Sequence, residues 1–370
     1  MNANTLLKIL SLSLPLSLTT NLTAQAQNTK EPTGSLKINI NPSGSKYMQL
    51  GVWNQTWLRV IENNPGTMVN NAPENTTMDA GFRRMRITST MQLSPRYLMF
   101  FQVGINNQSF ISGGGTGTGA NGQGKKTALF FHDAYNEFSI ISDSKDFQKP
   151  SLYLGAGLHA WNGVSRLTNA SSNKMLTADL PVYNFSNIEV SDQMSRQFGV
   201  FAHGNYKKLA YRMSLNKPFA TSNKPTVVNK AVDNNAGGGL SVSGYYYLQF
   251  LDKENQKSSF LAGSYLGEKK VFNVGIGFQH AKNATQSLNT HNEIIKHNTT
   301  TLGADIFTEF PVQLGVRPSY VSLYSVYYNY DLGKNYLRTT GIMNPGTANP
   351  EYTGITALEG SGNALYLHGT

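Results

Sequence analysis

The chain has 370 residues, no cysteine, only 14% charged residues and a formal net charge of +10. Without cysteine this sequence has no disulfide, no thiol nucleophile and no lipid-anchoring cysteine, and the excess of Lys and Arg favours anions or an anionic lipid surface as partners. Its 19 Tyr, 18 Phe and 35 Gly fit strands that cross a membrane as a barrel better than they fit a soluble protein.

Residues 1–26 have the pattern of a secretory signal peptide. Lys8 precedes an apolar stretch over residues 9–18, and the triplet Ala-Gln-Ala that ends at Ala26 is a small-x-small cleavage site. The apolar stretch is too short for the ~20 residues of a membrane-spanning helix. We therefore expect export, cleavage after Ala26 and a periplasmic lead over residues 27–45.

From residue 46 onward apolar and polar residues alternate, which predicts β-strands. In KYMQLGVWNQTWLRV, for example, Leu50, Val52 and Leu58 share one face while Trp57 and Arg59 share the other. Twelve segments follow this period, and no window of helical period competes with them. The sequence therefore predicts an all-β fold, a transmembrane antiparallel β-barrel over residues 46–370.

A glycine-rich segment separates the third and fourth predicted strands. Residues 113–127, GGGTGTGANGQGKKT, contain the pattern Gly-x-Gly-x-x-Gly, which occurs in nucleotide-binding loops. Such a loop is followed by a helix whose first N–H groups hold the phosphates. Here another alternating strand, TALFFHDAYNEFSI, follows, so we interpret the segment as an outer loop.

The lengths of the connections indicate a barrel in a membrane. Between predicted strands lie 20, 3, 18, 10, 34, 3 and 21 residues, then 20, 17, 8 and 33. Long and short connections alternate in outer-membrane barrels, whereas a β-sandwich has no reason to keep this rhythm. The exception is 251–270, which we expect to be a short rim strand or an extended periplasmic connection.

Charge predicts which face meets lipid. If the polar face met lipid instead, several cations would lie in hydrocarbon, which destabilises the protein by ~2–4 kcal/mol for each cation near the bilayer midplane. We therefore expect the polar face to line a lumen. The expected lumen residues are the basic Arg59, Arg84, Arg86, Lys208 and Arg212, the acidic Asp133, Glu137, Asp305 and Glu309, and the aromatic Trp53, Trp57 and Trp161. The arginines either select ions or pair with carboxylates that hold the wall. Tyr245–Tyr247 and the tyrosines of 320–330 are interpreted as interface girdles.

The connection 162–195 is the expected constriction. Folded into the lumen, it would bring Arg166, Asn169, Lys174 and Asp179 opposite the wall cations, and the resulting transverse field would select ions by sign. The alternative is a loop that lies on the outer surface.

The last predicted strand is short. It has about seven residues, where about 9–11 are needed to cross a bilayer, and the chain does not end on an aromatic residue. We therefore expect further strands to follow Thr370.

Five segments together resemble the phosphate-selective porin O and P-like family of Bacteroidetes-type outer-membrane porins. They are GFRRMRITSTMQLSPRYLMFFQVG, FFHDAYNEF, LYLGAGLHAWNGVSRLTNASSNKMLTADLP, SRQFGVFAHGNYKKLAYRMSLNKPF and SYLGEKKVFNVGIGFQH. The resemblance implies a sixteen-stranded barrel, of which about twelve strands are present here, a homotrimer, and passive uptake of anions or small solutes past cationic side chains.

The functional hypothesis is an outer-membrane porin of a Gram-negative bacterium that passes small hydrophilic solutes with a mild preference for anions such as phosphate. Two alternatives stay open: a non-transporting barrel that serves a secretion or gliding apparatus, and a porin for oligosaccharides. The histidines lack metal-ligand spacing and Gly-x-Ser-x-Gly is absent, so we expect no enzyme activity, cofactor or metal. We expect lipid as a partner but no nucleic acid.

Overall fold

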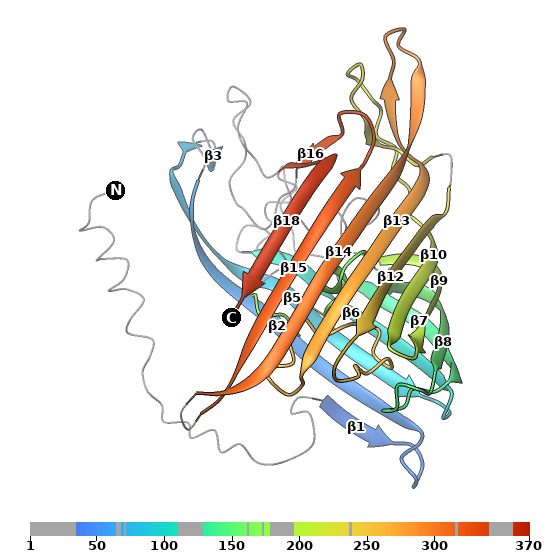
Figure 1. Cartoon of the computed structure of the whole chain (residues 1–370). Coiled ribbons are helices and arrows are strands. Elements are labelled where there is room, and N and C mark those ends of the chain that lie inside the picture. Colours follow the sequence, from blue (N-terminus) through green and yellow to red (C-terminus); the bar gives the residue numbers. More distant parts are fainter. Residues whose placement is uncertain are drawn as a thin grey trace, which may run out of the picture. The chain divides into compact units, whose positions relative to one another are not determined.

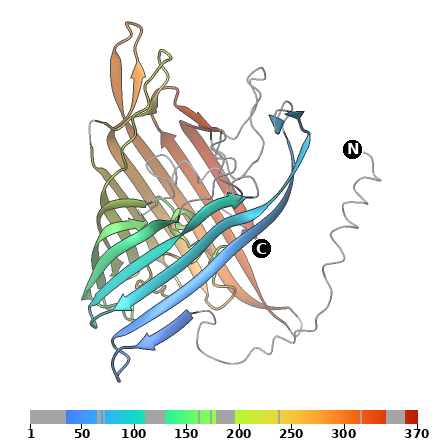
Figure 2. The same ribbon diagram turned by 180° about the vertical axis from the view of Figure 1, so that it is seen from behind.

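One antiparallel sheet contains most of the chain that can be described. The computed structural model describes residues 35–63, 68–69, 72–109, 129–160, 163–171, 174–177, 196–236, 239–314, 317–339 and 358–370. Residues 36–370 form one unit. Within this unit the sheet is strongly curved (Figures 1 and 2).

The sheet has fourteen strands within the described ranges. Their order is β1 (Ser35–Asn39), β2 (Tyr47–Glu62), β5 (Thr76–Gln92), β6 (Tyr97–Ser109), β7 (Phe130–Ile141), β8 (Ser151–Ala160), β9 (Arg196–Tyr206), β10 (Leu209–Lys217), β12 (Ser241–Gln249), β13 (Val271–Leu288), β14 (Ile294–Leu314), β15 (Arg317–Asp331) and β18 (Gly362–Gly369), with β11 (Val232–Asp233) paired to β13. Outside it, β3 (Met68–Val69) pairs with β4 (Ala72–Pro73), β16 (Leu337–Thr339) pairs with β17 (Leu358–Gly360), and α3 spans Arg166–Asn169.

The prediction of an all-β, antiparallel chain is confirmed. Each of the twelve predicted segments contains a strand, and strands that follow one another along the chain pair as antiparallel neighbours. In the described part of the chain, no pairing joins β18 to β1 or β2. The sheet is therefore open, and its closure into a barrel stays a prediction.

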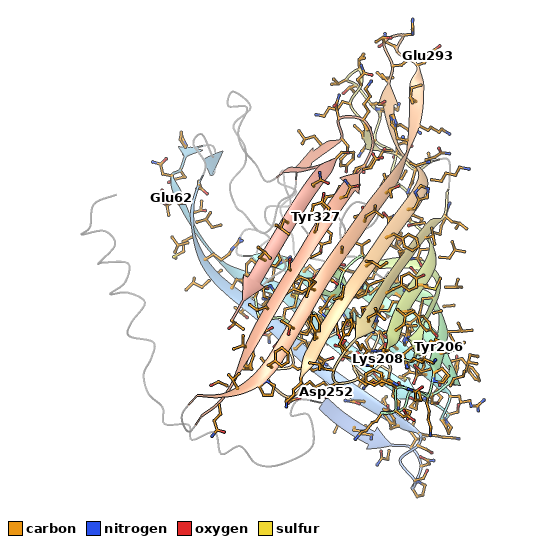
Figure 3. The ribbon with its side chains drawn as sticks, in the orientation of Figure 1. Glu62, Tyr206, Lys208, Asp252, Glu293 and Tyr327 are labelled. Atoms are coloured by element: carbon orange, nitrogen blue, oxygen red, sulfur yellow. The ribbon has the colours of Figure 1, made fainter. Side chains whose placement is uncertain are left out.

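The hairpin of β13 and β14 differs from the prediction. We expected a long loop over residues 282–298, but the two strands continue through it and residues 289–293 alone connect them. Their register shifts between Ala281 and Thr285, where a bulge redirects the hairpin. Figure 3 shows Glu293 at the end of this hairpin, beyond the neighbouring strands.

Several successive strands are joined by very short turns at one rim of the sheet, which we name the short-connection rim. Residues 93–96 and 207–208 form two of these turns, and Tyr206, Lys208 and Asp252 lie at the same rim (Figure 3). Within the described ranges no helical segment has the length and apolarity needed to cross a membrane.

Candidate functional site

The two faces of the sheet have opposite character, and the polar face is the covered one. On β14, Leu302 and Ile306 are 48% and 47% exposed, whereas Asp305 between them is 4% exposed. The same alternation gives exposed Val52, Leu154, Val200, Met213, Leu215, Ile276, Leu323 and Leu365, and buried Gln102, Asn205, Ser214, Asn216, Ser243, Asn273, Gln279 and Ser322. We name the polar side the inner face. The parity predicted from the sequence is confirmed for these positions.

Four arginines gather on the inner face of β2 and β5. Arg59 and Arg83 lie over the ring of Trp57 at 5.1 and 5.6 Å, and Arg86 lies over Trp53 at 5.8 Å. Arg84 donates a hydrogen bond to Gln55 at 2.7 Å. These contacts place cations against aromatic faces, where the ring quadrupole attracts them. We name Arg59, Arg83, Arg84 and Arg86 the arginine row.

Sequence periodicity missed Arg83. Two consecutive residues of a regular strand point to opposite faces, yet Arg83 and Arg84 are both buried. The register shifts at this point, so that Gln55 pairs with Arg84 and Thr56 with Phe82. Arg83 is thus the extra residue of a bulge. The doubled arginine in the sequence was the available signal.

The arginine row is less open to solvent than expected for a pore lining. Arg83, Arg84 and Arg86 are between 2% and 6% exposed. Arg86 donates hydrogen bonds to the carbonyl oxygens of Met85 and Ile105 at 2.8 and 2.7 Å and to the side chain of Asn106. Arg59 and the two tryptophans are only partly buried, so they are the most accessible members of this part of the wall.

The acidic lumen residues are all bound by protein groups. Asp133 forms an ion pair with Arg196 at 3.0 Å, and Glu137 lies 2.9 Å from the imidazole of His203. Asp305 accepts hydrogen bonds from Tyr245, Tyr324 and the backbone N–H of Arg166. Glu309 accepts hydrogen bonds from Ser264 and from the N–H groups of Tyr265 and Gly267. Each carboxylate therefore joins neighbouring parts of the chain.

Several tyrosines expected in interface girdles lie on the inner face instead. Tyr245, Tyr247, Tyr324 and Tyr328 are buried, whereas Tyr327 is exposed. The pairing of Tyr245 with Arg212 across β10 and β12 puts both on the same face. The girdle interpretation is therefore wrong for these four and for Tyr330, which is also buried. Strand register was the information that composition lacked.

The described part of the connection after β8, residues 163–171 and 174–177, packs on the inner face, and we name it the inward loop. Ser165 caps α3, and its hydroxyl lies 2.7 Å from that of Tyr328. Asn169 braces the segment by donating hydrogen bonds to the carbonyl oxygens of Gly163 and Ser165. Lys174 is exposed.

Arg166 is the centre of the inward loop. Its guanidinium donates hydrogen bonds to Glu254 and to the carbonyl oxygen of Ala262, both at 2.6 Å, and lies over the ring of Phe307 at 4.1 Å. Both charges of the pair are 1% exposed. Glu254 also accepts hydrogen bonds from Tyr265 and Asn273. Sequence reasoning placed Arg166 here but missed Glu254, which lies in a connection without periodicity.

A pair of glycines makes room for the inward loop. Gly277 and Gly303 face each other on β13 and β14, and a Cβ atom at either would lie 2.2 or 2.4 Å from the carbonyl oxygen of Val164. That distance is far inside van der Waals contact, and the opposing atom is backbone. Only glycine therefore allows the loop to lie this close to the wall.

Replacing Gly277 by alanine is expected to lower the free energy of unfolding by ~1–3 kcal/mol, as overpacking does in a filled interior. Chemical denaturation of folded protein in detergent micelles would measure the change. Gly369→Ala is the control, because the atom nearest to its added Cβ is the movable end of the Leu323 side chain. Equal stability of the two variants would contradict the packing of Val164 against this wall.

Residues 252–268, which we name the strap, connect β12 to β13 and do not form the rim strand that was one expectation for 251–270. Near their start, Lys253 pairs with Asp143 at 3.0 Å. Farther along, Arg212 donates hydrogen bonds to the carbonyl oxygens of Ser258 and Ser259. The end is held by Glu309 on β14. The strap thus runs over the inner face from the β7–β8 turn to β14.

Four other predicted site residues have different outcomes. Lys208 is exposed in the turn before β10 rather than on the wall of the strand. Its position at the rim is visible in Figure 3. Arg212 does lie on the inner face, but it is buried under the strap. Trp161 and Asp179 lie outside the described residues.

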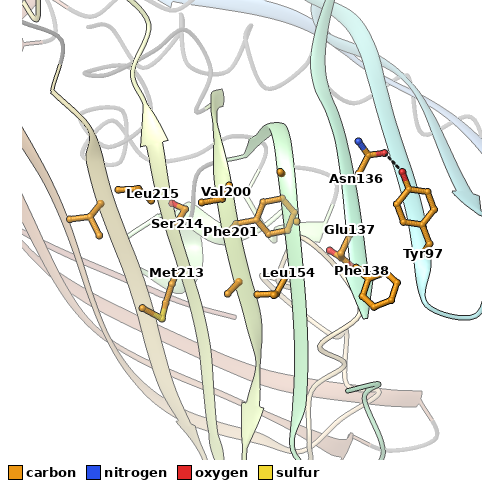
Figure 4. Close-up of a pocket in the computed structure, with 14 residues that line it drawn as sticks. Tyr97, Asn136, Glu137, Phe138, Leu154, Val200, Phe201, Met213, Ser214 and Leu215 are labelled. Atoms are coloured by element: carbon orange, nitrogen blue, oxygen red, sulfur yellow. Dashed lines mark hydrogen bonds between the residues drawn. The ribbon is translucent and has the colours of Figure 1, made fainter. Parts of the chain in front are cut away.

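A hollow of about 750 Å³ opens on the apolar face, away from the arginine row. Phe138, Leu154, Val200, Met213 and Leu215 line it, and Tyr97 donates a hydrogen bond to Asn136 at its edge (Figure 4). The lining is almost wholly apolar, so the hollow lacks the polar groups that would orient a hydrophilic solute.

Comparisons with known proteins found no matching family, no matching curated protein and no matching solved structure.

Proposed function

We propose that the sheet is the wall of an outer-membrane β-barrel and that the protein is a narrow diffusion channel with a mild preference for anions. The exposed apolar face and the buried polar face support the membrane setting. A soluble protein rarely exposes so many contiguous apolar side chains, whereas a transmembrane barrel exposes them to lipid on every strand.

The arginine row carries the proposed selectivity. Four arginines share β2 and β5, whereas the four predicted lumen carboxylates, Asp133, Glu137, Asp305 and Glu309, lie on β7 and β14. These four arginines and four carboxylates thus occupy different strands of the wall. A passing ion would experience this asymmetry as a transverse field, as it does beside charged rings in channels. Arg59 contributes most directly because it is the least buried of the four.

The test is the reversal potential of single channels formed by the complete polypeptide in a planar bilayer under a potassium chloride gradient. We expect chloride preference, and we expect Arg59→Gln to reduce the chloride-to-potassium permeability ratio by about two- to fivefold, since a unit charge a few Å from an ion contributes up to ~1 kcal/mol in water. Lys208→Gln is the control, because this cation is exposed at the short-connection rim. Cation preference would contradict the role of the arginine row, and absence of current would contradict the channel.

A second candidate is a barrel that does not transport but serves as an attachment component of a secretion or gliding apparatus. The strap and the inward loop favour it, because both cover the inner face between β7 and β14. In this case the long connections would be the docking surfaces. Protein without current that copurifies with fixed partners would support this candidate over the channel.

A further inference from the structure

The strap approaches the wall from the opposite end to the inward loop. It starts at the short-connection rim between β12 and β13, whereas the inward loop starts at the other rim between β8 and β9. The two meet where Ala170 bridges Leu261, and Ser171 and Leu261 donate backbone hydrogen bonds of 3.1 and 2.9 Å across the contact. The strap is therefore held at its middle by a segment that is itself not part of the wall.

The ends of the strap are anchored far apart in the sheet. The backbone N–H of Gln256 donates to Asp143 at 2.9 Å, next to β7, and Ser264 donates to Glu309 at 2.9 Å on β14. Six inter-strand steps of roughly 4.8 Å separate these strands along the sheet. The eight residue steps between Gln256 and Ser264 span at most roughly 28 Å when fully extended, so the strap crosses the curved inner face as a chord.

The attachments of the strap are mostly polar. The strap is held through side chains rather than through a backbone ladder to the wall: those of Asp143, Arg212 and Glu309 on the wall side, and its own Glu254 and Gln256, which bond to Asn273 and Tyr247. Leu261 is the strap's buried apolar anchor, packed with Ala210, Tyr245 and Tyr247, whereas Leu266 is 67% exposed. Segments with few buried apolar contacts open at lower free energy than the elements around them.

We propose that the strap is a gate of the channel. In this structure it crosses the inner face near the short-connection rim, and release of its first part from Asp143 would open a path between the strap and the β7–β8 turn. The ion pair of Lys253 and Asp143 is the latch, because Lys253 also donates hydrogen bonds to the carbonyl oxygens of Ser144 and Asp146 in the same turn. This inference rests on the proposed channel function.

The experiment combines movement of the strap with current. Gln256→Cys introduces a thiol into this cysteine-free sequence at a buried position in the first part of the strap, next to the contact with Asp143. In the complete polypeptide in lipid vesicles, its rate of modification by a small charged thiosulfonate reagent reports strap movement, while bilayer recordings report conductance. Lys253→Met removes the latch in this background. Lys257→Met is the matched control, because Lys257 is exposed on the same strap. Asp143→Asn tests the latch from the other side.

We expect Lys253→Met and Asp143→Asn to raise the modification rate about tenfold or more, since each leaves a mostly buried charge without its partner. Mean conductance should rise together with the modification rate, and Lys257→Met should change neither the rate nor the conductance. Faster modification with unchanged current would overturn the gate and leave the channel standing. Slow modification in every variant would show a fixed brace and overturn the gate. No current in any variant would overturn the channel and the gate together.

Discussion

Replacing Arg166 by glutamine is expected to lower the free energy of unfolding by ~3–5 kcal/mol, the usual cost of removing one partner from a buried ion pair. The carboxylate of Glu254 would stay buried without its counter-charge, and the carbonyl oxygen of Ala262 would lose its donor. Chemical denaturation in detergent micelles would measure the change. Lys174→Gln, on the exposed side of the same loop, should stay within about 0.5 kcal/mol of the unchanged protein.

The ion pair of Arg166 and Glu254 also predicts how the free energy of unfolding changes with pH. Burial alone would raise the pKa of Glu254, but the charge of Arg166 and the hydrogen bonds from Arg166 and Tyr265 outweigh burial and lower this pKa below its ordinary value. The stabilisation that ionised Glu254 gives to the folded state is therefore fully present above its unfolded-state pKa. It is lost as the pH falls through the lower, folded-state pKa. The difference between the unchanged protein and Arg166→Gln should shrink in that acid range. A difference that is small at neutral pH and grows on acidification would contradict a charged pair.

Replacing Ile306 by arginine is expected to destabilise the membrane-inserted protein by ~2–4 kcal/mol, the cost of a cation on the lipid face near the bilayer midplane. Ile306 lies near the middle of the apolar part of β14 and points away from the inner face. The measurement is a urea titration of folding into lipid vesicles, followed by tryptophan fluorescence.

Ile294→Arg is the matched control. It changes the same residue type on the same face of the same strand, and Ile294 is 59% exposed. Twelve residues separate the two positions, roughly 40 Å along a strand, which exceeds the ~25 Å height of the apolar band. We therefore expect little effect at Ile294. Equal effects at both positions would contradict insertion of this face into lipid.

The sequence predicted the wall strands because their side chains alternate over long stretches. On β14 each step from Leu302 to Phe310 changes face, so the period alone indicates both the strand and its orientation. The outer part of the β13–β14 hairpin, residues 282–288 and 294–298, was missed because polar residues interrupt the alternation there.

The contacts that decide the candidate site were less predictable. Glu254 lies in a connection, where no period assigns a face, and it meets Arg166 only because two distant segments converge on the same part of the wall. Arg83 turns inward through a bulge, which a rule of strict alternation excludes. The burial of Arg212 depends on the path of the strap, which no local pattern records.

The meeting of Ala170 with Leu261 also constrains the order in which the molecule assembles. The two residues are far apart in the sequence, and the strands from β9 to β12 lie between them in the chain. Contacts of such long range form only after the intervening chain has paid its loop-closure entropy. The intervening wall strands are therefore expected to pair first. The strap and the inward loop would then dock last. A newly assembled wall is therefore expected to pass through a stage in which water still fills its interior.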